Sequence, residues 1–214
     1  MSEYDNERSY WLTNLSSRLD DPSFQKMAEI ILEDRNNSKG IGLELGCGEG
    51  RLINLLPNIY GVDYSTLGMQ KNHDNNKWLV CANAAQLPYP DNYFDYIVTN
   101  SLHHMPYKRV LQEVHRVLKR DGKFYCFEPN RWHLYNLLVN KDFGIEIVGD
   151  RGFYLESLKQ EMSGLGLIPE KYRYIILNME RIRFLTRVQK ICQVIPTRLF
   201  QAWFTICAIK ITNS

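Results

Sequence analysis

Apolar runs of strand length recur along the chain. Gly40–Leu45 carries a single acidic residue, Ile59–Val62 follows it, and Phe204–Ile211 lies near the other end. Runs of about four to eight mostly apolar residues beside Gly, Pro or Asn are typical of buried strands. These three segments are therefore predicted to be strands, and the first two are expected to be neighbours in a parallel sheet.

Other apolar positions recur every three or four residues, which is the spacing of one face of a helix. Such sets cover residues 11–19, 24–31, 107–118, 155–165 and 182–195. The second set begins just after Pro22, a residue favoured in the first turn of a helix. The third begins after Pro106, and its helix is expected to stop at Gly122.

A glycine cluster stands directly after the first predicted strand. Gly46 and Gly48 lack a Cβ, so the backbone can turn tightly there and approach a ligand closely. Asp63 ends the second strand, and the carboxyl ends of neighbouring parallel strands meet at one edge of a sheet. A carboxylate at that edge can accept both hydroxyls of a ribose. The sequence therefore predicts a nucleoside-cofactor site in the crevice at the strand ends.

The glycine spacing separates two classes of cofactor. A dinucleotide fingerprint, Gly-x-Gly-x-x-Gly/Ala counted from Gly46, needs a small residue where this chain has Arg51. Here the third glycine is Gly50, and Glu44 stands two positions before the first. Glu-x-Gly-x-Gly-x-Gly resembles motif I of the class I S-adenosylmethionine-dependent methyltransferases.

The resemblance to this family extends over residues 40–130. Ala82–Pro88 is similar to the stretch after the family's third strand, and Tyr93–His104 to its fourth strand and the loop that faces the transferring methyl group. Glu113–Gly122 resembles the next helix and turn, and Phe124–Asn130 resembles strand five and its exit. Motifs in this order are more specific than motif I alone.

The resemblance implies an α/β fold, a Rossmann-like three-layer sandwich with a seven-stranded, mostly parallel sheet whose last strand is antiparallel. Within this single domain, residues 1–39 are expected to form an N-terminal helical cap and residues 40–130 the cofactor-binding half. Residues 131–214 then form the C-terminal half, with an insertion on the acceptor side. A length of 214 residues fits one α/β unit with additions.

The resemblance also implies S-adenosylmethionine as cofactor and S-adenosylhomocysteine as its product. The candidate cofactor residues are Glu44, Gly46, Cys47, Gly48, Asp63, Tyr64, Asn83, Ala84 and Asn100. The first four would hold the methionine end and Asp63 the ribose hydroxyls. Tyr64 could cover the adenine face or simply be an exposed aromatic side chain. Asn83, which stands where the family has Asp, could still accept a hydrogen bond from the adenine amino group, and its alternative role is a loop cap.

His103 and His104 are the candidate catalytic residues, because they follow the fourth strand where the methyl group should point. Methyl transfer from a sulfonium needs alignment above all, and it needs a base only when the acceptor must lose a proton. Either imidazole could be that base, and packing against the cofactor is the competing interpretation. No metal site is expected, because the cysteines and histidines do not have zinc spacing.

The expected acceptor is a small molecule, lipid-like acceptors included, methylated on an O, C or N atom. Asn100-Ser101-Leu102-His103 is not the Asn/Asp-Pro-Pro-Tyr/Phe loop used by family members that act on planar or exocyclic amino nitrogens. A formal net charge of +2 gives no global field for nucleic acid, so no such partner is expected. Aromatic residues in 131–154 are candidates for lining the acceptor pocket, and the protein is expected to be a monomer or a homodimer.

A cytoplasmic location is expected, because the amino terminus is polar and acidic and none of the five cysteines forms a Cys-x-x-Cys pair. Cys81 and Cys126 fall in apolar runs that are interpreted as buried strands. The basic amphipathic segment 181–199 is interpreted as a solvated helix. Peripheral contact of that segment with an anionic membrane is kept as the alternative.

Two other functions stay open at this point. An NAD(P)-dependent oxidoreductase would use the same crevice, although Arg51 argues against a dinucleotide. A non-catalytic activator of another methyltransferase would bind the cofactor but would have no acceptor pocket.

Overall fold

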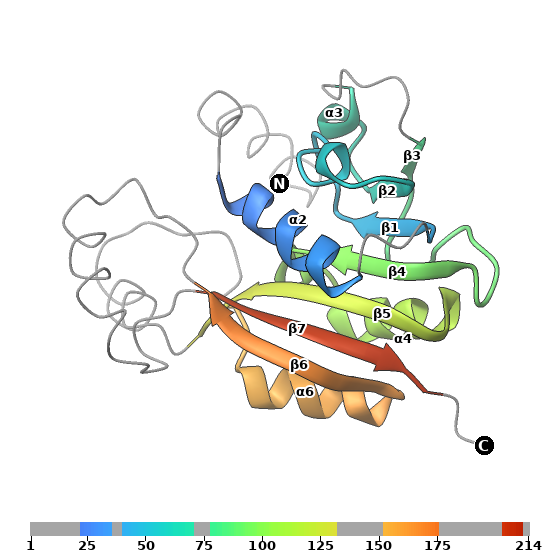
Figure 1. Ribbon diagram of the computed structural model, residues 1–214. Helices are drawn as coiled ribbons and strands as arrows, with labels where there is room; N and C mark the ends of the chain where they lie inside the picture. The colour runs from blue at the N-terminus through green and yellow to red at the C-terminus, as the bar shows by residue number, and fades with distance from the viewer. Residues whose placement is uncertain (1–21, 36–39, 71–77, 132–151, 176–202, 212–214) are drawn as a thin grey trace, which may run out of the picture.

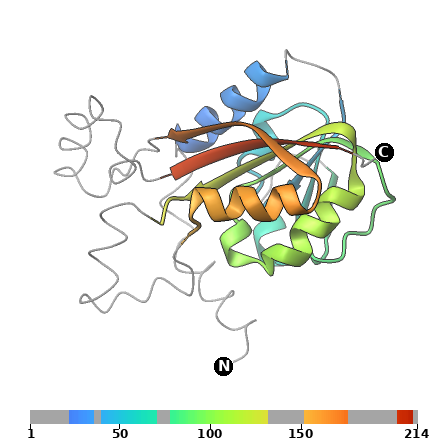
Figure 2. The ribbon, with the colours of Figure 1, turned by 90° about the horizontal axis from the view of Figure 1, so that it is seen from below.

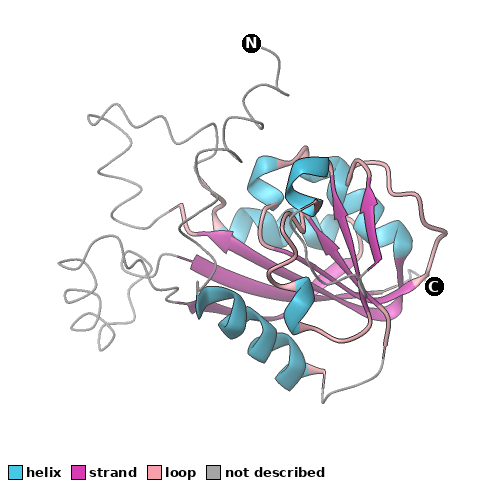
Figure 3. Cartoon of the chain, turned by 90° about the horizontal axis from the view of Figure 1, so that it is seen from above, coloured by secondary structure: helices cyan, strands magenta, loops and turns pink. Residues whose placement is uncertain are grey.

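A seven-stranded sheet forms the centre of the protein, with helices on both faces (Figure 1). The computed structural model describes residues 22–35, 40–70, 78–131, 152–175 and 203–211. The helices predicted over 11–19 and 182–195, the segment 181–199 and most of the proposed acceptor insertion lie outside these residues. The strands run through the middle of the molecule in Figure 3, where they are magenta between cyan helices.

The strand order across the sheet is β3-β2-β1-β4-β5-β7-β6. The strands are β1 (Gly42–Leu45), β2 (Ile59–Asp63), β3 (Trp78–Cys81), β4 (Phe94–Thr99), β5 (Leu118–Pro129), β6 (Leu167–Ile175) and β7 (Trp203–Lys210). The first five pair in parallel, whereas β7 is antiparallel to both of its neighbours. In Figure 1 the arrow of β7 accordingly points opposite to that of β4. The expected mostly parallel sheet with an antiparallel last strand is confirmed.

The described helices lie on both faces of the sheet (Figure 2). The helical segments are α2 (Pro22–Asp34), η1 (Ile53–Leu55), α3 (Thr66–Met69), η2 (Leu102–His104), α4 (Tyr107–Val117) and α6 (Leu155–Gly164), of which η1 and η2 are 3₁₀ turns. In Figure 2, α4 and α6 lie together on the side opposite α2. The expectation that the third helix runs to Gly122 was wrong: Leu118 is already extended, with ψ 135°, and begins β5.

Alternating side chains of the strands build two cores. On β5, Phe124 and Cys126 pack with α4 and α6, whereas Tyr125 and Phe127 pack with α2 and η1. Successive strand residues point to opposite faces, so a strand covered on both sides is apolar throughout. Each fully buried side chain of this kind contributes about 1.5–3 kcal/mol of transfer free energy.

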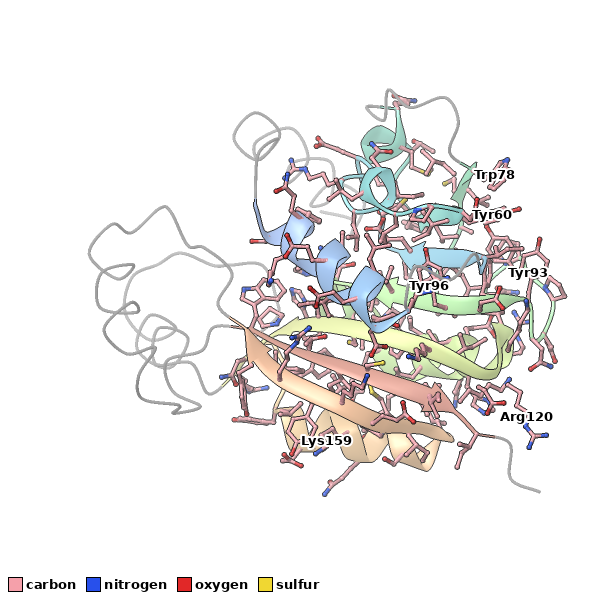
Figure 4. All side chains as sticks on the ribbon, viewed as in Figure 1. Tyr60, Trp78, Tyr93, Tyr96, Arg120 and Lys159 are labelled. Atoms are coloured by element: carbon pink, nitrogen blue, oxygen red, sulfur yellow. The ribbon has the colours of Figure 1, made fainter. Side chains whose placement is uncertain are left out.

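β3 is an edge strand and is less buried than the sequence suggested. Cys81 is exposed there, which corrects its assignment to a buried strand, whereas Cys126 in β5 is buried as expected. Trp78 remains 57% exposed, although its ring stacks on Tyr60 with the ring centroids 4.7 Å apart. The Tyr60 ring also meets that of Tyr93, with the ring centroids 6.4 Å apart (Figure 4). An edge strand has a neighbour on one side only, and this leaves its side chains partly open.

Candidate active site

The carboxyl ends of four parallel strands meet at one edge of the sheet. Leu45 of β1 is in register with Val62 of β2 and Thr99 of β4, and Thr99 is in register with Cys126 of β5. The Thr99 hydroxyl donates a hydrogen bond to the Leu45 carbonyl oxygen at 3.1 Å, which joins the exits of β4 and β1. The loops that leave these strands therefore face one another, and they carry most of the predicted site residues.

The glycine-rich turn after β1 has the backbone geometry for which glycine is suited. Gly46 and Gly48 adopt φ values of +72° and +49°, in the left-handed region. The N–H groups of Gly46 and Cys47 both donate to the Val62 carbonyl oxygen, at 2.8 and 3.1 Å. A Cβ on Gly46 would lie 2.2 Å from Ser101 Oγ, so the loop after β4 closes directly over this turn.

Asp63 ties the end of β2 to this turn. Its Oδ2 accepts the Gly48 N–H at 2.8 Å, and its Oδ1 accepts the Ser65 N–H at 2.7 Å. The residue is 8% exposed, and burial raises the pKa of Asp63 while the two backbone hydrogen bonds oppose the rise. Each carboxylate oxygen has a second lone pair, so both can still accept a hydroxyl group.

Glu44 lies buried in β1 beneath the same turn. It is 2% exposed and interacts with the backbone N–H of Ile53 at the start of η1. Burial raises the pKa of Glu44 well above its usual range; the Ile53 bond opposes this, and the nearby Asp63 adds to it. Its Oε2 has no hydrogen-bond partner among the described residues. A buried carboxyl oxygen without a partner is costly, and a cationic ammonium group is the kind of ligand that would satisfy it.

The predicted adenine-side residues are more open. Tyr64 is 54% exposed, Ala84 packs partly against the core on the α4 side, and Asn83 is exposed. Asn83 Oδ1 accepts the Ala85 N–H at 2.8 Å, so this amide caps its own loop, as the alternative interpretation held. A carbonyl oxygen can accept a second hydrogen bond, so the loop cap leaves a role at the adenine edge open.

Helix α4 anchors the loop that follows Asn83. Glu113 Oε2 accepts the Leu87 N–H at 2.7 Å, and the Arg116 guanidinium donates to the carbonyl oxygens of Leu87 and Tyr89 at 3.0 and 2.8 Å. Arg116 also forms ion pairs with Glu113 and Asp91. Hydrogen bonds from Arg116 lower the pKa of Glu113, with burial opposing. The Glu113–Arg116 pair is therefore a structural clamp on the loop that presents Asn83.

The two candidate catalytic histidines have different surroundings. His103 Nδ1 lies 2.6 Å from Glu128 Oε2, and the Glu128 side chain is fully buried at the end of β5. The His104 ring centroid lies 4.0 Å from that of His103. His104 is the more exposed of the two. Partial burial, and after it the nearby His103, lower the pKa of His104 to about 4.

Sequence reasoning missed Glu128 as a site residue. The signal was available, since this carboxylate directly follows the apolar run Phe124–Phe127 and so falls at the carboxyl end of a strand.

Cys47 lies inside the turn and is buried. Burial raises the pKa of the Cys47 thiol, and the nearby Glu44 and Asp63 raise it further. Asn100 leaves β4 beside Ser101 and is partly buried.

The residues of this edge suit a cofactor with a cationic amino acid end and a ribose. A turn whose backbone leaves no room for a Cβ, a carboxylate at the adjoining strand end and the orphaned Glu44 oxygen lie together. A family model described as a methyltransferase domain matches residues 43–126, the segment that contains all of them. Residues 43–126 are a methyltransferase domain of the class I, S-adenosylmethionine-dependent kind. S-adenosylmethionine is the cofactor of that family.

Relatives of the methyltransferase domain come from archaea and bacteria. An uncharacterised protein of Methanocaldococcus jannaschii is 40% identical over 118 residues, which cover 51% of this chain and 46% of that protein. A demethylmenaquinone methyltransferase of Geobacillus kaustophilus is 40% identical over 127 residues, which cover 51% and 54% of the two chains. The chain thus spans about half the length of the curated relatives it matches.

Solved structures share the fold at lower identity. A protein of Pyrococcus horikoshii OT3 aligns with a TM-score of 0.70 and 17% identity, over 99% of this chain and 100% of that one.

Two further properties concern the described part of this methyltransferase domain. None of its helices is long and apolar enough to cross a bilayer. Within the same residues, no three His, Cys, Asp or Glu side chains are grouped as a metal ion would require.

Proposed function

We propose that the protein transfers the methyl group of S-adenosylmethionine to an O, C or N atom of a small molecule. The observation that supports this proposal is the contact between Asp63 Oδ2 and the Gly48 N–H at 2.8 Å, since a carboxylate beside a glycine-rich turn at the strand ends suits the ribose of a nucleoside cofactor. When bound, S-adenosylmethionine supplies a methyl group on a positively charged sulfur, a strongly activated leaving group.

Each residue of the site then has a separate task. Asp63 accepts the ribose hydroxyls, and the backbone of the turn with Glu44 receives the methionine end. Tyr64, Asn83 and Ala84 line the adenine side. His103 and His104 lie on the loop that closes over Gly46, where a base can take a proton from the acceptor.

A small-molecule acceptor is supported by the relative named demethylmenaquinone methyltransferase and by the near-neutral charge of the chain. It also follows from the loop after β4, which has the sequence Asn100-Ser101-Leu102-His103 and lacks the two prolines of the amine-directed loop. The same proposal places the protein in the cytoplasm as a monomer or homodimer. Lipid-like acceptors are included in it.

Calorimetric titration with S-adenosylhomocysteine tests cofactor binding. The wild-type protein is expected to bind, and Asp63→Ala is expected to lose the binding. Asp121→Asn, which removes a negative charge from an exposed position of β5, is the matched control and should bind like wild type. Because Asp63 also holds the Gly48 and Ser65 N–H groups, thermal unfolding of each variant must show that it is folded. Binding that persists in folded Asp63→Ala contradicts the proposal.

Two further measurements separate the alternative functions. Titration with NADH should give no saturable binding, and a tight complex would favour an oxidoreductase. Incubation with a methyl-labelled cofactor and a metabolite extract, without a second protein, should yield a labelled small molecule. Cofactor binding without any labelled product is the result expected of a non-catalytic activator.

A further inference from the structure

Glu128 is a fully buried carboxylate, and three of its contacts with described residues are made to the turn η2. Its Oε1 accepts the Leu102 N–H at 2.8 Å, and its Oε2 accepts the His103 N–H at 3.3 Å. The same Oε2 lies 2.6 Å from His103 Nδ1, the shortest of the three contacts. The His103 side chain retains 11% exposure, so its ring is not sealed from the site.

Burying a carboxylate costs free energy unless its negative charge is compensated by hydrogen bonds or a cationic partner. The two backbone N–H groups need only an acceptor, which a neutral amide side chain could also provide. The contact with Nδ1 is different, because a carboxylate fixes which imidazole nitrogen carries the proton. Among the described residues, the other titratable side chains placed against this pair are His104 on the same turn and Cys126, whose Sγ lies 3.9 Å from Glu128 Oε1.

We infer that Glu128 is a positioning residue that holds His103 with its proton on Nδ1, so that Nε2 accepts the proton of a hydroxyl group on the methyl acceptor. This inference rests on the methyl-transfer function proposed above. It narrows the acceptor from any O, C or N compound to one with an ionisable hydroxyl group. An unprotonated amine already has a free electron pair and needs no such base at the moment of attack.

The proposed step balances in charge and atoms. The acceptor oxygen forms a bond to the methyl carbon, and the carbon–sulfur bond breaks with its electron pair going to sulfur. The hydroxyl proton moves to His103 Nε2, and the resulting imidazolium forms an ion pair with Glu128. Before the step the His103–Glu128 pair carries one negative charge, and afterwards it is neutral. The imidazolium then releases its proton to water.

Nitrogen NMR of the protein with S-adenosylhomocysteine bound tests the inference without any acceptor. With ¹⁵N-labelled histidine, the His103 signals are assigned by their loss in His103→Gln. At neutral pH they should report a protonated Nδ1 and an unprotonated Nε2. A proton on Nε2 overturns the inference. In Glu128→Gln the amide can offer its N–H to Nδ1, so the tautomer should switch.

The labelled-methyl reaction provides the second readout. His103→Gln should lose activity by about 10²–10⁴-fold with unchanged S-adenosylhomocysteine affinity, whereas the control His115→Gln, at a partly buried position of α4, should not. Added imidazole should restore part of the activity of His103→Ala, which a purely structural role does not allow. The labelled product should be an O-methyl compound. An N- or C-methyl product, or full activity in His103→Gln, overturns this inference alone, while failure to bind S-adenosylhomocysteine removes the proposed function itself.

Discussion

Asp63 at the end of β2 accepts the backbone N–H of Gly48 across the exit of β1, at 2.8 Å. The contact joins two segments separated by a 3₁₀ turn and a strand, and it fixes the glycine-rich turn against the neighbouring strand. It also gives the carboxylate two roles. One is to organise the backbone of the site, and the other is to present its remaining lone pairs to a ligand.

Gly46→Ala should disrupt the turn. The residue has φ +72°, and an added Cβ would lie 2.2 Å from Ser101 Oγ and 2.8 Å from Met105 Cε. A loss of about 2 kcal/mol or more in the free energy of unfolding is expected, together with loss of S-adenosylhomocysteine binding. Gly164→Ala is the matched control, because nothing lies within 4 Å of its added Cβ, and it should change stability by less than about 1 kcal/mol. Urea denaturation measures the free energy of unfolding of each variant, and equal stability of the two variants contradicts the expectation.

Glu44→Gln should change how stability depends on pH. Burial raises the pKa of Glu44, so the neutral form is favoured in the folded state. Its contribution is complete below the ordinary value of about 4.3 and is lost as the pH rises through the folded-state pKa. Wild type should therefore lose stability relative to Glu44→Gln as the pH rises above about 4.3, by at most about 1.4 kcal/mol per pH unit, until the pH passes the raised folded-state pKa. Denaturant unfolding across this range measures the difference.

The control for this comparison is Glu170→Gln, which removes a carboxylate from an exposed position of β6. Its stability should follow the wild-type curve over the whole pH range. If Glu44→Gln does the same, Glu44 is ionised in the folded protein and the expectation is wrong.

Arg116→Lys should loosen the loop that presents Asn83. Lysine cannot reproduce the guanidinium bonds to Glu113, Asp91 and the two loop carbonyl oxygens. Stability should fall by about 1–3 kcal/mol, and the Leu87 N–H, now held by Glu113, should exchange with solvent faster. Hydrogen exchange measures this directly. Arg109→Lys on the exposed side of α4 should leave the exchange of Leu87 unchanged, and a similar effect of both variants would exclude a specific clamp.

Asp34→Asn should weaken the packing of α2 on the sheet. Burial opposes ionisation of Asp34, but hydrogen bonds from Lys123, Lys171 and Tyr125 outweigh it and hold the pKa of Asp34 well below its usual range. This stabilisation is present above the ordinary pKa of about 3.9 and is lost as the pH falls toward the folded-state value. Asp34→Asn should therefore be less stable by about 2–3 kcal/mol at pH 7, and the gap should close in acid. A gap that stays constant down to pH 2 contradicts this reasoning.

Much of the sheet could be predicted because its signals are local. The apolar run before Gly46, the run that ends at Asp63 and the Phe204–Ile211 run each carry their own boundary residues, and the structure has strands at all three. The end of α4 was less predictable. Helical spacing continues to Leu118, but pairing of β5 with β4 begins at that residue, where Leu118 is in register with Phe94. Whether residue 118 stays in the helix or pairs in the sheet depends on the neighbouring strand, and the local sequence does not decide it.

The sequence alone determined that the glycine-rich turn and Asp63 follow neighbouring strands, because chain order and apolar spacing are sufficient for that. Only the tertiary structure decided that His103 meets the Glu128 carboxylate. Glu128 lies 25 positions from His103 along the chain, and the two side chains meet because β4 and β5 pair in parallel and bring their carboxyl ends together. A partner across a sheet depends on strand order and register, and both are set by packing of the whole domain.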